Sequence, residues 1–232
     1  MTSYDTILFD FDGTLIDSRE GVERCLRHAF EQLGFDSAMA DPTERFIGPS
    51  LMESFTTFCG FDHETAVRAV RLYRERYSDV GLYEMVVFPG VREMLERLYA
   101  QGRRLMLATL KPEPYVQRIL DHYSLAPLFA GYVGSNLDGS RNTKDEVVAD
   151  AIAALGRVAL DRIVMVGDHT GDVLAARNHG IDAIAVSYGS GSTADLELAG
   201  PVAIAHSVEE LGSLLGTNDS QPCVGRQGRL HC

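Results

Sequence analysis

The sequence lacks any apolar run of the roughly 20 residues that a membrane-spanning helix needs, although 45% of its 232 residues are hydrophobic. Its first ten residues, MTSYDTILFD, lack the basic start and long apolar stretch of a secretory signal. The sequence ends in LHC, without a lipidation motif. We therefore expect a globular protein that works in the cytoplasm and does not bind membranes.

The chain is also poor in cysteine and in positive charge. Its cysteines are Cys25, Cys59, Cys223 and Cys232, whose spacing fits no metal-binding pattern, so we expect them to be reduced. The chain has 21 basic and 33 acidic residues. The resulting formal charge of −12 disfavours binding to nucleic acids. A small phosphorylated substrate is compatible with this charge if the site itself supplies cations. The composition leaves the oligomeric state open.

Short apolar runs that alternate with helical patterns indicate the fold class. Strand-like runs lie at residues 5–10, 104–109, 129–135, 162–168 and 182–189. Helical patterns that end at a glycine lie at residues 91–102, 144–156 and 172–180. Most of the strand-like runs are continuously hydrophobic, which favours strands covered on both faces. This order predicts an α/β fold with a doubly wound, Rossmann-like parallel sheet.

The residues between the first two strands follow a helical pattern throughout. Apolar positions 22, 25, 26, 29, 30 and 33 form one helical stripe, and positions 66, 70, 73 and 77 form another. We expect a core domain of residues 1–15 and 88–216, and a helical domain of residues 16–87 over the active edge of the sheet. The polar, glycine-rich residues 217–232 are expected to be a disordered tail.

Two aspartates follow the first strand in ILFDFDGTLIDS, residues 7–18. Side chains at i and i+2 of an extended segment share a face, so Asp10 and Asp12 would lie side by side. Like charges held that close need a cation or a shared proton. A turn at Asp12-Gly13 is the alternative interpretation of this pair.

A second acidic pair follows another buried strand in VMVGDHTGDV. Asp172 alone fits the N-cap of the next helix, and Asp168 alone fits a turn. However, the carboxyl ends of parallel strands meet at one edge of a sheet. We therefore expect these carboxylates to approach Asp10 and to hold Mg²⁺, a cation that favours phosphorylated substrates.

A phosphate group also needs donors at this edge. Thr109 ends the run RLMLAT and can offer a hydroxyl with nearby backbone N–H groups. Lys144 opens a helix, where the helix N-terminus itself favours an anion. A solvated surface lysine is the alternative interpretation of Lys144, and Lys111 is a weaker candidate of the same kind.

These residues resemble the four ordered motifs of haloacid-dehalogenase-superfamily phosphatases. The motifs are represented by DFDGTLIDS, the strand-end Thr109, Lys144 and GDHTGD. RFIGPSLMESF, FPGVREML, GSNLDGSRNTKDEVV and SYGSGS are similar to the phosphoglycolate-phosphatase-like branch, and closest to its 5′-nucleotidase-like members. The resemblance covers about residues 5–215 and implies phosphomonoester hydrolysis, with the helical domain acting as a mobile cap.

The resemblance also implies roles for single residues. Asp10 would be the nucleophile, forming an aspartyl-phosphate, and Asp12 would be the general acid/base. Thr109 and Lys144 would hold the phosphoryl oxygens, together with the backbone N–H of Leu110.

The same resemblance implies a magnesium site. Asp10, the backbone carbonyl of Asp12 and Asp168 would bind Mg²⁺, and Asp172 would support them.

Two positions, Leu110 and His169, depart from the family pattern, and a third, Arg45, is a candidate for contacting the leaving group of the substrate. Leu110 stands where near relatives have Ser or Asn, so it can lend only its backbone N–H to the phosphate. His169 stands where a small or charged residue is common, and we interpret it as a loop residue. Arg45, with FIGPS at residues 46–50, is the cap segment expected to face the leaving group; a solvated helix-end arginine is the alternative.

Several functions remain open at this stage. Nucleoside monophosphates and phosphoglycolate are both candidate substrates. A sugar phosphomutase would retain the same motifs. A phospho-acceptor domain or a binding protein without turnover would also fit the acidic residues on a doubly wound sheet.

Overall fold

A computed structural model describes residues 4–217 and contains a parallel sheet. The strands are β1 (Thr6–Phe9), β4 (Arg104–Pro112), β5 (Gly131–Ser135), β6 (Ile163–Gly167), β7 (Asp182–Val186) and β8 (Ala203–Ala205). They lie in the order β5-β4-β1-β6-β7-β8, and all neighbours are parallel. The order runs outward in both directions from β1, so the predicted doubly wound sheet is confirmed.

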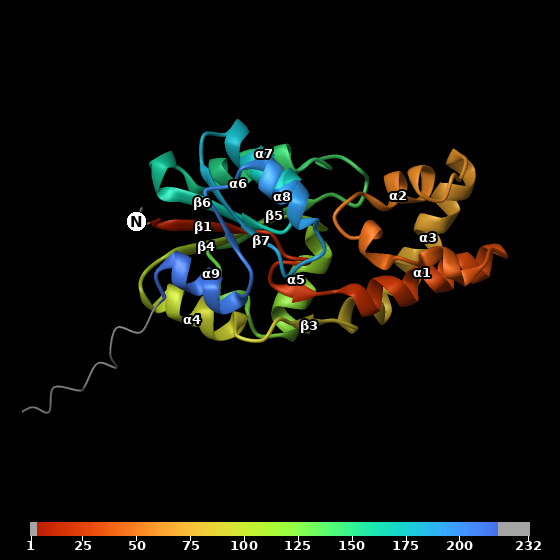
Figure 1. Ribbon diagram of the computed structural model, residues 1–232. Coiled ribbons are helices and arrows are strands. Elements are labelled where there is room, and N and C mark those ends of the chain that lie inside the picture. The colour runs from red at the N-terminus through yellow and green to blue at the C-terminus, as the bar shows by residue number, and fades with distance from the viewer. Residues whose placement is uncertain (1–3, 218–232) are drawn as a thin grey trace, which may run out of the picture.

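Helices cover both faces of this sheet (Figure 1). One layer contains α6 (Lys144–Leu155), α7 (Thr170–Asn178) and α8 (Thr193–Ala199). The other contains α4 (Val91–Ala100), α5 (Glu113–His122) and α9 (Val208–Leu215). Successive side chains of a strand point to opposite faces, so Leu8 joins the core under α6 while Ile7 and Phe9 join the core under α4 and α5.

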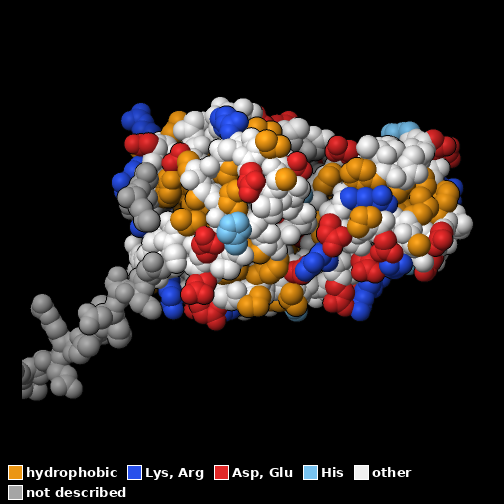
Figure 2. Space-filling view, viewed as in Figure 1, with side chains coloured by type: hydrophobic (Ala, Val, Ile, Leu, Met, Phe, Trp, Pro, Cys, Tyr) orange, Lys and Arg blue, Asp and Glu red, His pale blue; other side chains and the backbone are white. Residues whose placement is uncertain are grey.

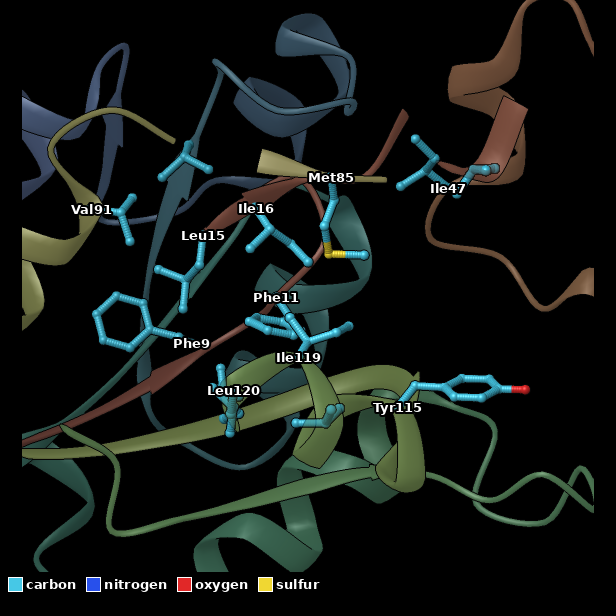
Figure 3. Packing of buried hydrophobic residues seen from close by; sticks show 14 of the residues in the cluster. Phe9, Phe11, Leu15, Ile16, Ile47, Met85, Val91, Tyr115, Ile119 and Leu120 are labelled. Atoms are coloured by element: carbon cyan, nitrogen blue, oxygen red, sulfur yellow. The ribbon is translucent and has the colours of Figure 1, made fainter. Parts of the chain in front are cut away.

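The core on the α5 side extends past the end of β1. Phe9 and Phe11 lie close to Ile119 and Leu120 of α5 (Figure 3). All four side chains are buried. Burial of each stabilises the fold by roughly 1.5–3 kcal/mol, and this packing holds the segment around Asp10 against the sheet.

The segment after β1 forms a helical unit beyond one end of the sheet (right in Figure 1). Its helices are α1 (Arg19–Leu33), α2 (Leu51–Thr57) and α3 (His63–Asp79), with 3₁₀ turns at Ser37–Ala40, Thr43–Phe46 and Gly81–Tyr83. The rings of Phe46 and Phe55 pack edge-on against Phe30. The helices expected from the two apolar stripes are therefore confirmed.

A short antiparallel ribbon joins this unit to the core. β2 (Ile16–Asp17) precedes α1, and β3 (Val86–Val87) leads back toward α4. Ile16 pairs with Val87, and Asp17 pairs with Val86. Both chain crossings between the helical unit and the core thus lie side by side.

The surface of the helical unit carries intermixed charges on the face shown in Figure 2. Along α1, Arg24 forms ion pairs with Glu20 and Glu84, and Arg27 does so with Glu23. Exposed pairs of this kind contribute little stability, about 0–1 kcal/mol each.

Parts of the sequence-based expectations fall at the edge of the described residues. Thr217, the first residue of the expected tail, is 7% exposed, and its N–H donates to the carbonyl of Gly212. The remainder of the expected tail lies outside the described residues, with Cys223 and Cys232. Cys25 and Cys59 are free thiols. Between residues 4 and 217, no helix is long and apolar enough to cross a membrane.

Candidate active site

Three carboxylates from separate segments meet at the carboxyl edge of the sheet. Asp10 follows β1, Asp168 follows β6, and Asp172 lies in the first turn of α7. One oxygen from each lies within 4.8 Å of the others, and the three residues are 8%, 0% and 1% exposed. The structure thus brings together the acidic residues that the sequence places after different strands.

Lys144 lies among these carboxylates. Its Nζ is 2.8 Å from Oδ1 of Asp10 and 2.8 Å from Oδ1 of Asp172, and it donates to the carbonyl of Ala108 at 3.3 Å. Burial alone would lower the pKa of Lys144, but the charges of Asp10 and Asp172 outweigh it and raise that pKa above its usual value. Lys144 is therefore a buried cation and not a solvated surface residue.

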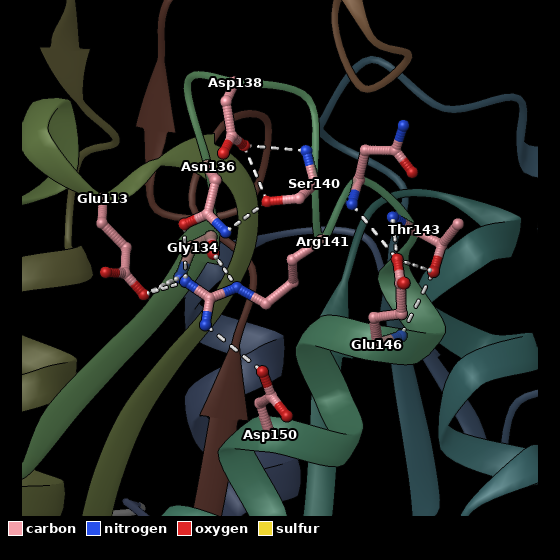
Figure 4. Close-up of polar contacts among 10 residues, drawn as sticks. Glu113, Gly134, Asn136, Asp138, Ser140, Arg141, Thr143, Glu146 and Asp150 are labelled. Carbon is pink, nitrogen blue, oxygen red and sulfur yellow. Dashed lines mark hydrogen bonds and ion pairs between the residues drawn. The ribbon is translucent and has the colours of Figure 1, made fainter.

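The helix that carries Lys144 begins with a capping box. The hydroxyl of Thr143 accepts from the N–H of Glu146 at 3.3 Å, and the Glu146 carboxylate accepts from the N–H of Thr143 at 3.1 Å (Figure 4). This reciprocal pair satisfies backbone donors that a helix start leaves free. It fixes the first turn of α6 and hence the origin of the Lys144 side chain.

The loop before α6 is fixed by Arg141 (Figure 4). Its Nε donates to the carbonyl of Gly134 at 2.7 Å, and its guanidinium forms ion pairs with Glu113 and with Asp150 at 3.2 Å. Arg141 has φ +48°, a left-handed conformation that is rare outside glycine. These bonds tie the β5–α6 loop to three other segments and position the start of α6.

Asp172 occupies a different place in its helix from the one expected. His169 is the N-cap residue of α7, and the Asp172 Oδ2 accepts from the N–H of His169 at 3.1 Å. The alternative interpretation of Asp172 as the N-cap of this helix is therefore wrong. Burial raises the pKa of Asp172 to about 6; the nearby charges of Asp10 and Asp168 act in the same direction, and Lys144 opposes them.

Asp168 is held by donors from two loops. Its Oδ2 accepts from the N–H and the hydroxyl of Ser190 at 2.8 and 2.9 Å. Its Oδ1 lies 3.1 Å from Nδ1 of His169. Burial works to raise the pKa of Asp168, but the hydrogen bond and charge of His169 lower it overall. Burial would likewise lower the pKa of His169, yet Asp168 raises it to about 9.

Glycines allow the surrounding backbone to approach these carboxylates. A β-carbon at Gly189 would lie 2.5 Å from Oδ2 of Asp168, and one at Gly167 would lie 2.2 Å from Oδ2 of Asp172. No real side chain tolerates such contacts. The backbone at these glycines therefore packs directly against the carboxylates.

The second aspartate of the first motif has a separate partner. Lys111 Nζ lies 2.8 and 2.9 Å from the two carboxylate oxygens of Asp12. Sequence analysis predicts only a weak role for Lys111 as a phosphate ligand and does not predict this pairing. The backbone N–H of Lys111 also donates to Oγ1 of Thr109 at 3.2 Å, so the hydroxyl proton of Thr109 remains available for another acceptor.

Leu110 and Arg45 make structural contacts. The carbonyl of Leu110 accepts from the Ser135 hydroxyl at 2.6 Å, which fixes the backbone beside Thr109. Arg45 donates to the carbonyl of Met39 at 2.9 Å, and its guanidinium lies over the rings of Phe46 and Phe58. These contacts of Arg45 all lie within the helical unit.

The helical unit reaches the carboxylates through Gly48. A β-carbon at Gly48 would lie 2.9 Å from Nε2 of His169, so the two residues are in close contact. The 46–50 segment therefore lies next to the loop that carries Asp168.

Open space at the site is small in this arrangement. A cavity of about 10 Å³ is lined partly by Gly13, Gly189 and Ser190, which lie next to Asp168, although no site carboxylate lines it. A cavity of about 440 Å³ lies on the other side of the β2–β3 ribbon, lined partly by Asp17, Glu44 and Val86. None of the site carboxylates lines the larger cavity, so we do not assign it to the site.

The carboxylates have the character of a cation site. Oδ1 of each carboxylate is buried and faces a single cationic group, Lys144 for Asp10 and Asp172 and His169 for Asp168. Three carboxylates outnumber their cationic neighbours, even with His169 protonated. Hard oxygen donors with such an excess of negative charge fit a divalent cation such as Mg²⁺.

The protein is thus a doubly wound α/β protein with an acidic site at the carboxyl edge of its sheet. The chain belongs to the haloacid dehalogenase-like hydrolase family, whose model matches residues 7–186. The family membership and the hydrolase class expected from the motifs are therefore confirmed.

Individual relatives cover nearly the whole chain. It is 39% identical to a 5′-nucleotidase of Pseudomonas aeruginosa, over 91% of this chain and 94% of the relative. It is 36% identical to the tyrosine-protein kinase PtkA of Mycobacterium tuberculosis, over 90% of this chain and 72% of the relative. A more distant relative, the phosphoglycolate phosphatase of Caulobacter vibrioides, is 32% identical over 79% of each chain.

A solved structure matches the fold closely. The crystal structure of a predicted phosphatase from Clostridium acetobutylicum superposes with a TM-score of 0.86. It is 36% identical, and the match covers 92% of this chain and 98% of that one.

Proposed function

We propose that this protein is a Mg²⁺-dependent phosphatase that hydrolyses a small phosphorylated metabolite through an aspartyl-phosphate on Asp10. The observation that carries the proposal is the meeting of Asp10, Asp168 and Asp172 within 4.8 Å, with Lys144 between them. The phosphatases among its relatives support the same reaction class.

In the proposed reaction, a carboxylate oxygen of Asp10 attacks phosphorus, and the bond from phosphorus to the leaving oxygen breaks. Lys144 and the Thr109 hydroxyl bind the phosphoryl oxygens and stabilise the charge that develops on them. Asp12 gives a proton to the leaving oxygen. It then takes a proton from the water that attacks the aspartyl-phosphate, so that Asp10 is regenerated and phosphate is released.

Asp10, Asp168 and the backbone carbonyl of Asp12 would hold Mg²⁺, with Asp172 in support. When bound, the cation neutralises phosphoryl oxygens that would otherwise repel the carboxylate of Asp10. The meeting of three buried carboxylates, with oxygens within 4.8 Å of one another, supports this assignment.

Residues 16–87 are proposed to act as a movable cap on a core domain of residues 1–15 and 88–216. Both crossings between the two parts lie in the β2–β3 ribbon, which is a compact hinge. The small cavity near the site has room for about one water molecule. Substrate entry therefore requires the Gly48 segment to move away from His169.

The substrate class that we favour is a nucleoside 5′-monophosphate, since the 5′-nucleotidase relative is 39% identical over most of both chains. A panel of nucleoside monophosphates, phosphoglycolate and sugar phosphates, assayed for released phosphate, tests this choice. Release of an isomerised sugar phosphate without free phosphate would instead identify a phosphomutase.

The central experiment measures hydrolysis of a generic aryl phosphate with Mg²⁺, with excess EDTA, and with Asp10→Asn. We expect turnover that needs Mg²⁺ and falls by at least about 10³-fold in the Asp10→Asn variant, because the nucleophile is lost. Undiminished turnover in EDTA or in Asp10→Asn would refute the proposal. A stable phosphorylated protein without turnover would point to a phospho-acceptor.

Protein-tyrosine phosphorylation is a second candidate, because the PtkA relative is 36% identical over 90% of this chain. Incubation with γ-labelled ATP and a tyrosine peptide tests it directly. Transfer of label to the peptide would favour this function, whereas release of label only as phosphate favours the phosphatase.

A further inference from the structure

We propose that Lys111 is a positioning residue that acts through Asp12, by holding both oxygens of its carboxylate in one orientation. This inference rests on the proposed function, because it concerns the group assigned there as the general acid/base. It differs from the role expected from the sequence, in which Lys111 was a weak candidate for binding the phosphate.

Strand register brings the two residues together. β1 and β4 are neighbours, and Phe9 pairs with Leu107 near the end of β1. Lys111 lies in the part of β4 that continues past Leu107, and Asp12 lies in the loop just past Phe9, which places the two residues next to each other. The ammonium lies 2.8 and 2.9 Å from the two carboxylate oxygens.

The Lys111 side chain is almost entirely enclosed, with 5% of it exposed. Its ammonium lies 5.3 Å from the centre of the Tyr77 ring on α3. Tyr77 is itself stacked on Tyr73 and packed edge-on against Tyr115, with ring centres 5.3 Å apart in each case. The ammonium is therefore confined between the Asp12 carboxylate and an aromatic wall of the helical unit.

The use of lysine across the chain supports a specific role. The sequence contains only two lysines, Lys111 and Lys144, and its other basic residues are arginines. Lys144 contacts Asp10, and Lys111 contacts Asp12. A lysine ammonium is a compact point charge, whereas a guanidinium is a wide planar fork. Each aspartate of the first motif thus has its own compact cation.

Fixing Asp12 has a direct chemical consequence. A general acid/base must present an oxygen within hydrogen-bond distance of the group that gains or loses the proton. A carboxylate free to rotate would do so for only part of the time. By contacting both oxygens, Lys111 restricts this rotation, so its removal should lower kcat without weakening substrate binding.

A double-mutant cycle tests whether Lys111 acts through Asp12. The variants are Lys111→Met, Asp12→Asn and the two combined, assayed on an aryl phosphate with Mg²⁺. We expect Lys111→Met to lower kcat about 10-fold to 100-fold, with KM changed less than about twofold, and Asp12→Asn to lower it further. In the Asp12→Asn background, Lys111→Met should have no additional effect. Arg71→Met, on the exposed face of α3, controls for the loss of one positive charge.

Two outcomes would overturn the inference. If the fold-decrease in kcat of the double variant equals the product of the two single decreases, Lys111 acts independently of Asp12. A raised KM with unchanged kcat would make it a substrate ligand. If Lys111→Met does not fold, as judged by circular dichroism, Lys111→Gln and Lys111→Arg take its place in the same cycle. Lys111→Arg keeps the charge and should restore part of kcat.

Failure of the proposed function has a separate signature. It would appear in the wild-type protein, as turnover that survives EDTA or Asp10→Asn. If only the Lys111 inference fails, turnover is still lost in EDTA and in Asp10→Asn, and only the kcat values of the double-mutant cycle differ from expectation.

Discussion

Gly13 and Asp168 follow two different strands, β1 and β6, yet a β-carbon on Gly13 would lie 2.1 Å from Oδ2 of Asp168. Gly13 also has φ +76°, a conformation that side chains rarely adopt. Glycine is therefore needed at position 13 for two reasons. Its backbone conformation disfavours any other residue, and the Asp168 carboxylate leaves no room for a β-carbon. The two effects can be separated by experiment.

Gly13→Ala is expected to abolish most phosphatase activity and to lower the affinity for Mg²⁺, because the new methyl group must displace Asp168. Gly102→Ala is the matched control: Gly102 has φ +77° and nothing within 4 Å of its added β-carbon. The control should lose only about 1 kcal/mol of unfolding free energy, the cost of the backbone conformation, and should keep its activity. Equal activity losses in both variants would contradict this account.

Lys144→Met removes the cation that separates Asp10 from Asp172. Breaking a buried ion pair on one side costs about 3–5 kcal/mol of unfolding free energy. We expect this loss in EDTA, measured by urea denaturation, together with a loss of turnover. Added Mg²⁺ should reduce the difference in stability from wild type, since it supplies positive charge to the same carboxylates. A difference that is independent of Mg²⁺ would argue against a cation site there.

The sequence was sufficient to predict where the main carboxylates lie. Asp10 and Asp168 follow long buried strands, and parallel strands bring their carboxyl ends together whatever the details of packing. The helical pattern at residues 144–156 also placed Lys144 correctly at the start of a helix. Some elements were missed, among them β8, whose three residues AIA give no periodic signal, and the ten-residue helix α5, which follows β4 without a break.

Contacts that depend on register or rotamer could not be predicted. The pairing of Lys111 with Asp12 follows from the alignment of β1 with β4, which the sequence does not specify. The N-cap of α7 is His169 and not Asp172. The helix begins at Thr170, although aspartate is the more common residue type at an N-cap. Arg45 has the charge of a substrate ligand but lies over two phenylalanine rings.

Glu84, close to the β2–β3 ribbon, offers a pH-dependent prediction. Hydrogen bonds from Arg76, and then from Arg24, hold the pKa of Glu84 below its usual value despite partial burial. A depressed folded-state pKa means that Glu84 stabilises the fold above its unfolded pKa and loses that contribution as the pH falls through the folded value. Glu84→Gln should therefore lower the unfolding free energy by about 1 kcal/mol at pH 7.

The difference between wild type and Glu84→Gln should shrink toward zero between about pH 5 and pH 3, as the carboxylate is protonated. Urea denaturation at several pH values measures it. Glu75→Gln serves as the control, because Glu75 is an exposed glutamate on α3. A difference that grows on acidification would have the wrong sign for a depressed pKa.

The contact between Tyr77 and Lys111 predicts that the helical unit influences Asp12 from a distance. Tyr77→Phe keeps the ring beside the ammonium and should leave kcat within about twofold of wild type. Tyr77→Leu removes the ring, whose attraction for a buried cation is about 1–2 kcal/mol, and should lower kcat about 5-fold to 30-fold. Because Tyr77 also stacks on Tyr73, hydrogen exchange in α3 should rise in the Leu variant. In a Lys111→Met background the two Tyr77 variants should have equal kcat, since the ring then has no cation to hold. Unequal values in that background would show that Tyr77 affects turnover by a route that does not involve Lys111.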